Sequence, residues 1–214
     1  DSDFDYAMTY SFWPWHLLTL INPEMFGNPA RGDYWGYANY WEDALYVGLL
    51  PLLLAVSAVF RRMRATDGRG CAPADARADV HRGVRGFALL LLPVTLLLAL
   101  GSNTPLFPWL FRHVPTFSMF QAPSRYLIWL EFSLALLAAL GAEYWRRPEK
   151  RALYWTRLGL MGAVALTLGA GLALALMGDI QPTFIRGTAL AGVFALGSCA
   201  LSLLAPPRDR TASR

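Results

Sequence analysis

Cysteine and histidine are scarce in this 214-residue chain, which has two cysteines and three histidines. The sequence patterns HExxH, CxxC, GxGxxG and the P-loop are absent, so none of the common zinc, redox or nucleotide sites is indicated. His16, His81 and His113 are scattered along the chain and form no spacing typical of metal ligands. We therefore expect no structural metal.

Charge is sparse as well, at 16% of residues, and five long stretches contain very little of it. Each stretch has about 17–21 residues, the length that a helix needs to cross a hydrocarbon core about 30 Å thick. Lipid offers no hydrogen bonds to the backbone, so helix is the expected state of each stretch. The sequence predicts an all-α polytopic membrane protein with spans at about 44–60, 84–100, 126–145, 158–177 and 184–204.

The loops divide the basic residues unevenly, with 15 of the 19 Lys+Arg on one side of the predicted spans. Positive residues resist translocation, so that side is predicted to be cytoplasmic, with the N-terminus outside and the C-terminus inside. Cys71 and Cys199 fall on the cytoplasmic side and are expected to be free thiols. The net charge of +4 then reflects topology and contact with lipid headgroups, and no nucleic-acid partner is expected.

Three regions follow from this topology: an extracytoplasmic aromatic-rich loop at 1–43, a five-helix bundle at 44–204 and a cytoplasmic tail at 205–214. Short helices lying on the outer face are predicted at Phe12–Ile21 and at the amphipathic segment Phe107–Val114. Residues 61–83 contain glycine, proline and unpatterned charge, and are predicted to be a flexible cytoplasmic linker.

The segment from Pro115 to Tyr126 carries the strongest local signal for a site. Pro123 suits the first turn of the third span, because its missing N–H costs nothing there. Ser124, Arg125 and the free amides of that turn are then predicted to face the outer interface, an arrangement that suits a phosphate. The alternative reading is an arginine that extends to the lipid headgroups without binding a specific ligand.

Three acids are further candidates for polar chemistry. Glu131, about two turns deeper in the same span, is predicted to point into the bundle, either as part of a site or in a buried pair with Arg186 or a tyrosine. Glu42 and Asp43 precede the first span, where the helix dipole alone would explain them. Otherwise they belong to an acidic outer cavity that accepts a proton or holds a divalent cation.

Four stretches of the chain resemble one protein family. Leu17-Leu-Thr-Leu-Ile-Asn-Pro-Glu-Met-Phe-Gly27 and Tyr46-Val-Gly-Leu-Leu-Pro-Leu-Leu-Leu-Ala55 resemble a loop and the following span of YfhO-like bacterial membrane proteins. Leu98-Ala-Leu-Gly-Ser-Asn-Thr-Pro-Leu-Phe107 and residues 115–141 resemble the next span, the outer loop and the arginine-headed span of that family. The resemblance covers about residues 15–145.

The family is placed among the GT-C glycosyltransferases of the bacterial inner membrane, which use polyprenyl-phosphate-linked sugars. The resemblance implies inverting sugar transfer at the outer face, with Ser124, Arg125 and Gln121 as candidate ligands of the lipid phosphate. Gln121 stands where the family often has an arginine. The resemblance also implies that an acid in the first outer loop of the complete protein serves as base. Glu42 and Asp43 are the weaker candidates within this chain, and no tightly bound cofactor is expected.

The chain opens at Asp1 with neither a signal peptide nor a preceding span, so we expect a C-terminal or internal fragment that is inactive alone. The alternative is a signal peptide that has been removed. The missing N-terminal part of the same protein is then an expected partner. The alternative function is a non-catalytic membrane subunit of a larger complex. Small residues at every fourth position of the fourth and fifth spans would form its interface.

Overall fold

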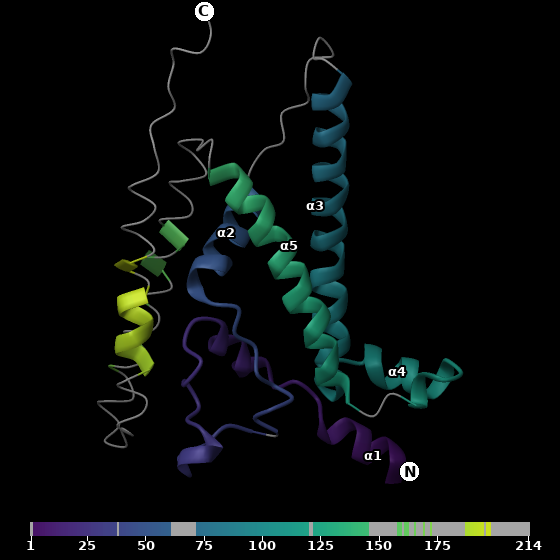
Figure 1. Cartoon of the computed structure of the whole chain (residues 1–214). Helices are drawn as coiled ribbons and strands as arrows, with labels where there is room; N and C mark the ends of the chain where they lie inside the picture. The colour runs from purple at the N-terminus through teal and green to yellow at the C-terminus, as the bar shows by residue number, and fades with distance from the viewer. Residues whose placement is uncertain are drawn as a thin grey trace, which may run out of the picture.

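The computed structural model describes most of the first two thirds of the chain and short pieces of the last third (Figure 1). The described residues are 2–37, 39–60, 72–119, 122–145, 158–159, 161–162, 165, 169, 172, 187–194 and 196–197. Within these residues every regular element is helical, so the predicted all-α class is confirmed for the described part of the chain.

Two of the described helices are long and apolar enough to cross a membrane. They are α3, Ala72–Ala99, and α5, Leu127–Trp145, with apolar windows at Asp79–Ala99 and Pro123–Glu143. They coincide with the predicted second and third spans. The predicted fourth and fifth spans lie mostly outside the described residues.

The helix of the predicted first span is shorter than expected. Helix α2, Leu49–Phe60, has 12 residues and is therefore only about 18 Å long at 1.5 Å per residue. It begins five residues later than predicted because Gly48 has a φ of +88°, a left-handed conformation that stops the helix from extending backwards. The preceding segment is instead held by Thr19, whose Oγ1 donates a hydrogen bond to the Leu45 carbonyl at 3.0 Å.

The prediction of a flexible linker at 61–83 is wrong for its second half, because α3 begins at Ala72. Residues 72–83 contain four alanines and three arginines or histidines that are compatible with helix. Pro73 occupies the first turn, where the missing N–H breaks no helical hydrogen bond. Glycine and proline were therefore poor markers of a loop here.

Helix α5 forms the centre of the bundle and crosses between α2 and α3 (Figure 1). Leucines at helical spacing on α5 pack in one core with small residues of the two neighbouring helices, namely Leu127, Leu130, Leu134 and Leu137 with Ala55, Ala58, Ala88 and Ala99. The backbones of α2 and α5 lie close together at Gly141, where an added Cβ would lie 2.0 Å from the Leu54 carbonyl oxygen. Glycine thus allows α2 and α5 to touch.

The outward faces of α3 and α5 are apolar but exposed. Leu90 on α3 is 67% exposed, and Ile128 and Trp129 on α5 are 66% and 52% exposed. Large apolar side chains gathered on an uncovered surface are unfavourable in water and are typical of an interaction or membrane surface. The exposed faces of α3 and α5 therefore have the character of an interaction or membrane surface.

Residues 10–12 connect the elements at one end of the bundle. The Phe12 N–H donates to the Ala99 carbonyl at 2.9 Å, and the Asn103 side chain donates to the Phe12 carbonyl at 2.9 Å. Ser11 Oγ accepts a hydrogen bond from the Ser102 N–H at 2.8 Å. The two segments that the charge pattern predicts to be extracytoplasmic, 1–43 and 101–125, consequently meet at the same end.

Short helices cover this end of the molecule. Helices α1, Ser2–Thr9, and α4, Leu106–His113, contact each other through Phe4 and Phe111, whose ring centroids are 5.5 Å apart. The other described short elements are the 3₁₀ helices η1 Pro14–Leu20, η2 Pro29–Arg31, η3 Gly101–Asn103, η4 Phe117–Met119 and η5 Pro123–Tyr126. Helix α4 and η1 lie at the two positions where short surface helices were predicted. Figure 1 shows α4 running sideways from the lower end of α3.

Candidate functional site

The arginine at the start of the third span pairs with an acid of the first loop. Arg125 Nη2 lies 3.0 Å from Glu42 Oε1, and Arg125 Nε lies 3.2 Å from Glu42 Oε2. Two hydrogen bonds from one guanidinium edge to one carboxylate form a bidentate fork. The Arg125 side chain is 71% exposed, and an ion pair so exposed adds only about 0–1 kcal/mol to stability. The fork therefore contributes little to holding the fold together.

The predicted role of Ser124 and of the neighbouring amides at the interface is wrong. Ser124 is fully buried, and its N–H donates to the Tyr10 carbonyl at 3.0 Å. The Arg125 N–H donates to the Ala122 carbonyl at 3.1 Å, within the 3₁₀ turn η5. Tyr10 engages the Ser124 amide and the turn itself engages the Arg125 amide, so the exposed group at positions 124 and 125 is the Arg125 side chain. Gln121 lies outside the described residues.

Asp43, next to Glu42 in sequence, is buried and pairs with a histidine. His16 Nδ1 lies 2.8 Å from Asp43 Oδ2, and the two side chains are 3% and 2% exposed. Burial raises the pKa of Asp43, and the hydrogen bond from His16 opposes part of that rise. The helix dipole does not explain the two acids, because α2 begins only at Leu49. That interpretation of Glu42 and Asp43 is corrected here.

His16 is enclosed by aromatic rings. Its ring centroid lies 4.7 Å from that of Phe26 and 5.1 Å from that of Trp13. When the carboxylate of Asp43 accepts the Nδ1–H of a neutral imidazole, Nε2 carries a lone pair and acts as an acceptor. Nε2 is buried and has no hydrogen-bond partner among the described residues. A buried polar atom of this kind usually indicates a missing water or ligand.

His16 and Asp43 line a cavity of about 150 Å³ between two loops. The cavity is lined by His16, Thr19, Pro23, Phe26, Gly27, Tyr34, Tyr40, Asp43, Ala44, Leu45 and Tyr46, and none of these described lining residues is lysine or arginine. Burial raises the pKa of Tyr34 to about 12, so this phenol is neutral near pH 7. Its hydroxyl donates to the Tyr37 carbonyl at 3.0 Å, which leaves its oxygen free to accept.

Glu131 connects α5 to the same cavity wall. Its side chain is half-buried, and its carboxylate accepts a hydrogen bond from the backbone N–H of Tyr46, a lining residue. A tyrosine was one of the two partners predicted for a buried pair, although the tyrosine contributes its backbone rather than its hydroxyl. The other predicted partner, Arg186, lies outside the described residues.

The described residues contain no group of three or more His, Cys, Asp and Glu side chains that could hold a metal ion. Glu42 faces Arg125 while Asp43 faces His16, so these two acids do not converge on a shared cation. The arrangement does not fit a divalent cation held between them.

His16 is the member of the site that sequence reasoning missed. It was noted only as one of three scattered histidines, and 27 residues separate it from Asp43. The local sequence offers one signal, because His16 directly follows an aromatic run, Phe12 to Trp15, and lies in the 3₁₀ helix η1, Pro14–Leu20. Its partner is determined by how the two loops fold together, which no spacing rule describes.

No protein-family model, curated protein or solved structure matches the chain.

Proposed function

We propose that this chain is the membrane part of a polyprenyl-phosphate-sugar-dependent glycosyltransferase that acts at the outer face of the bacterial inner membrane. The observation that carries the proposal is the Arg125–Glu42 fork. It sets an exposed guanidinium, already engaged by an anion, at the start of a helix long enough to span a bilayer. The Glu42 carboxylate occupies the position that two oxygens of a lipid phosphate would take.

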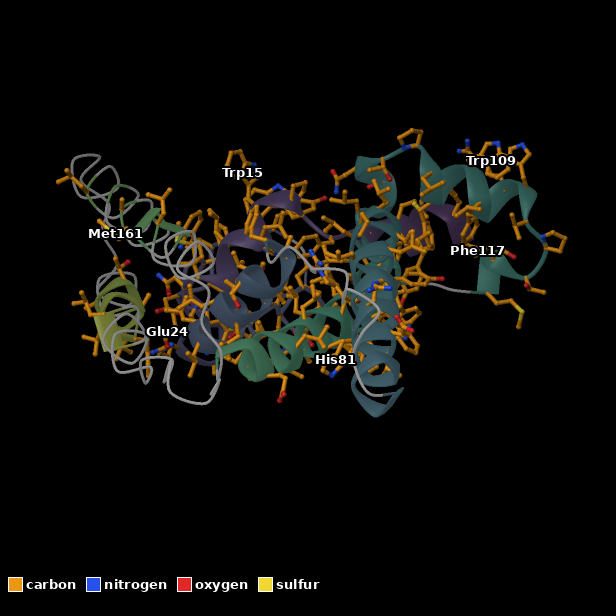
Figure 2. All side chains as sticks on the ribbon, turned by 90° about the horizontal axis from the view of Figure 1, so that it is seen from above. Trp15, Glu24, His81, Trp109, Phe117 and Met161 are labelled. Atoms are coloured by element: carbon orange, nitrogen blue, oxygen red, sulfur yellow. The ribbon has the colours of Figure 1, made fainter. Side chains whose placement is uncertain are left out.

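The multi-pass topology belongs to the same proposal, with five spans, the N-terminus outside and the C-terminus cytoplasmic. It is supported by the 15-to-4 division of basic residues and by the meeting of both predicted outer segments at one end of the bundle. Exposed aromatic side chains at this end add support, because tryptophan and tyrosine favour the headgroup level. Trp15 is 63% exposed and Trp109 is 55% exposed, and both point away from the ribbon in Figure 2.

In the proposed function a lipid phosphate displaces the Glu42 carboxylate from the guanidinium of Arg125. The phosphate approaches laterally, because the surface of α5 beside the fork is apolar and exposed at Ile128 and Trp129. Displacement frees the carboxylate of Glu42 at the moment when the ligand binds. Glu42 is therefore a competitor of the phosphate in the empty site rather than one of its ligands.

This competition gives the experiment that tests the proposal. Residues 1–214 are placed in nanodiscs and titrated with undecaprenyl phosphate. Arg125→Ala should bind about 10- to 100-fold more weakly, because charge-assisted hydrogen bonds contribute about 1.5–3 kcal/mol. Arg125→Lys keeps the charge but cannot form the bidentate fork, so its affinity for the lipid phosphate should lie between those of Arg125→Ala and wild type. Glu42→Gln should bind up to about fivefold more tightly, since it removes a competing pair of about 0–1 kcal/mol.

Arg31 and Glu24 supply the matched control, because they form a second arginine–glutamate pair in the same loop region. Arg31→Ala and Glu24→Gln should leave the affinity unchanged. Equal affinity of wild type, Arg125→Ala and Glu42→Gln would contradict the proposal and leave Arg125 as a headgroup anchor. Equal effects of both pairs would contradict it too, because they would reveal only general surface charge.

A further inference from the structure

The cavity beside His16 and Asp43 is not used by the lipid-phosphate site and has the features of a second binding site. We infer that it is a subsite for one pyranose ring, in which the Nε2 atom of His16 accepts a hydrogen bond from a ring hydroxyl. The inference rests on the proposed function only for the origin of the ring, which belongs to a sugar that donates or accepts in the transfer.

The size of the cavity suits a single six-membered ring. Its volume is about 150 Å³, and an apolar cavity of about 150 Å³ is known to accept benzene. A second ring of an oligosaccharide would have to lie outside the cavity.

The lining favours a neutral ligand. Lysine and arginine are absent from the described lining, and the Asp43 carboxylate would repel an anion, so a phosphate belongs on Arg125 and not here. Asp43 is the one carboxylate in that lining, and it is already bonded to His16, so a divalent cation would find too few oxygen ligands.

The remaining chemistry matches a sugar. Pyranose rings have an apolar face of C–H groups and a rim of hydroxyls. The rings of Phe26, Tyr34 and Tyr40 supply flat apolar surface, which is typical of a small-molecule site with few polar groups. His16 lines the cavity, and its Nε2 is buried and lacks a partner among the described residues. When Asp43 is a carboxylate it can accept only from Nδ1–H, so Nε2 of the neutral imidazole is an acceptor and requires a hydroxyl donor.

The position of the cavity relates it to the phosphate site. Glu42 and Asp43 are consecutive residues, so their Cα atoms are about 3.8 Å apart. One carboxylate reaches Arg125 and the other reaches His16. The lipid-phosphate site and the sugar subsite are therefore built on adjacent residues.

The test measures binding of free glucose to residues 1–214 in nanodiscs, with no lipid phosphate present. Histidine labelled with ¹⁵N gives only three imidazoles, from His16, His81 and His113. In wild type we expect His16 to carry its hydrogen on Nδ1, with the Nε2 resonance shifting as glucose is added. His16→Asn keeps a donor for Asp43 but removes Nε2, and should lose binding at least tenfold. The matched control is His113→Asn, which changes an exposed histidine of α4 and should bind glucose as wild type does.

Cyclohexane tests whether the hydroxyls matter, and it should bind more weakly than glucose and leave the Nε2 resonance unmoved. An Nε2 resonance that does not respond to glucose would overturn the inference. This measurement is made on the wild-type protein, so it is valid even if His16→Asn does not fold. If Arg125→Ala leaves both glucose binding and lipid-phosphate binding unchanged, the proposed function is contradicted. The sugar subsite would still stand in that case. If polyprenyl-phosphate glucose competes with free glucose for the cavity, the bound ring belongs to the sugar donor. If the two do not compete, the bound ring belongs to the acceptor.

Discussion

Glu42 and Asp43 are consecutive residues, yet their carboxylates have different surroundings. Glu42 is partly exposed and paired with an exposed guanidinium, whereas Asp43 is buried against His16. Removing a carboxylate from water disfavours its charged form, and this is the main reason that the pKa of Asp43 is raised. The two acids are therefore expected to respond differently to pH and to substitution.

Asp43→Asn tests the buried acid. Because the pKa of Asp43 is raised above its ordinary 3.8, the folded protein binds this proton more tightly than the unfolded chain does. The resulting stability is present below the unfolded pKa and is lost as pH rises through the folded pKa. Wild type should therefore lose stability relative to Asp43→Asn as the pH rises above about 3.8, the ordinary pKa of this carboxyl.

The measurement is the midpoint of thermal unfolding over that pH range, with Asp79→Asn as the control on an exposed acid of α3. Parallel pH profiles of wild type and Asp43→Asn, or a profile of opposite slope, would show that burial does not set this pKa.

Glu131 gives a second prediction at the level of the residue. The Glu131→Gln variant keeps an oxygen that can accept from the Tyr46 N–H, so this change should cost little stability. Glu131→Leu leaves that N–H without its acceptor and should cost about 1–3 kcal/mol. Thermal unfolding in detergent compares the two variants. A leucine variant as stable as the glutamine variant would mean that water replaces the carboxylate.

The candidate site was only partly predictable from the sequence. Arg125, Glu42 and Asp43 could be selected because charge next to an apolar span is unusual, and that signal is local. Their partners could not be predicted, because 83 residues separate Arg125 from Glu42 and 27 separate Asp43 from His16. Ser124 was assigned to the wrong environment for the same reason, since its burial depends on the distant Tyr10.

At the level of the elements, hydrophobic length predicted the helices better than it predicted their ends. The cores of α3 and α5 coincide with predicted spans because both runs are long and apolar. The start of α2 was missed because the left-handed backbone of Gly48 keeps the helix from beginning earlier in the apolar run. The start of α3 was missed because Pro73 in a first turn was taken as a sign of a loop.

Helix contact gives the prediction at this scale. Gly141→Ala would place a Cβ 2.0 Å from the Leu54 carbonyl oxygen, so α2 and α5 would have to separate. We expect a loss of about 1–3 kcal/mol, the usual range for overpacking. Gly86→Ala on α3 is the matched control, because nothing lies within 4 Å of an added Cβ there. It should be neutral or stabilising by up to about 1 kcal/mol, since alanine is the better helix former.

Unfolding in a detergent series would compare these two glycine variants directly. Equal stability of Gly141→Ala and Gly86→Ala would show that α2 and α5 do not pack as closely as described.

For the whole molecule, charge and hydropathy predicted which segments share a side, and the structure adds how those segments are joined. The first loop bonds to the ends of α3 and η5 through Tyr10, Ser11 and Phe12. This brings the Arg125–Glu42 fork and the sugar-sized cavity to the same end. Hydropathy could not predict how these segments are connected, because the connection consists of backbone and short side-chain hydrogen bonds between distant segments.

The sidedness of that end is the central claim, since both proposed sites depend on its lying outside. Cysteine labelling in intact cells tests it most directly, after Cys71 and Cys199 are replaced by serine. Single cysteines at Ala30 and Met119, both exposed, should react with a membrane-impermeant maleimide. Cysteines at Gly68 and Pro148, in the predicted cytoplasmic loops, should react only after the membrane is opened. Labelling of Gly68→Cys in intact cells, with Ala30→Cys protected, would contradict the orientation and both outer-face sites with it.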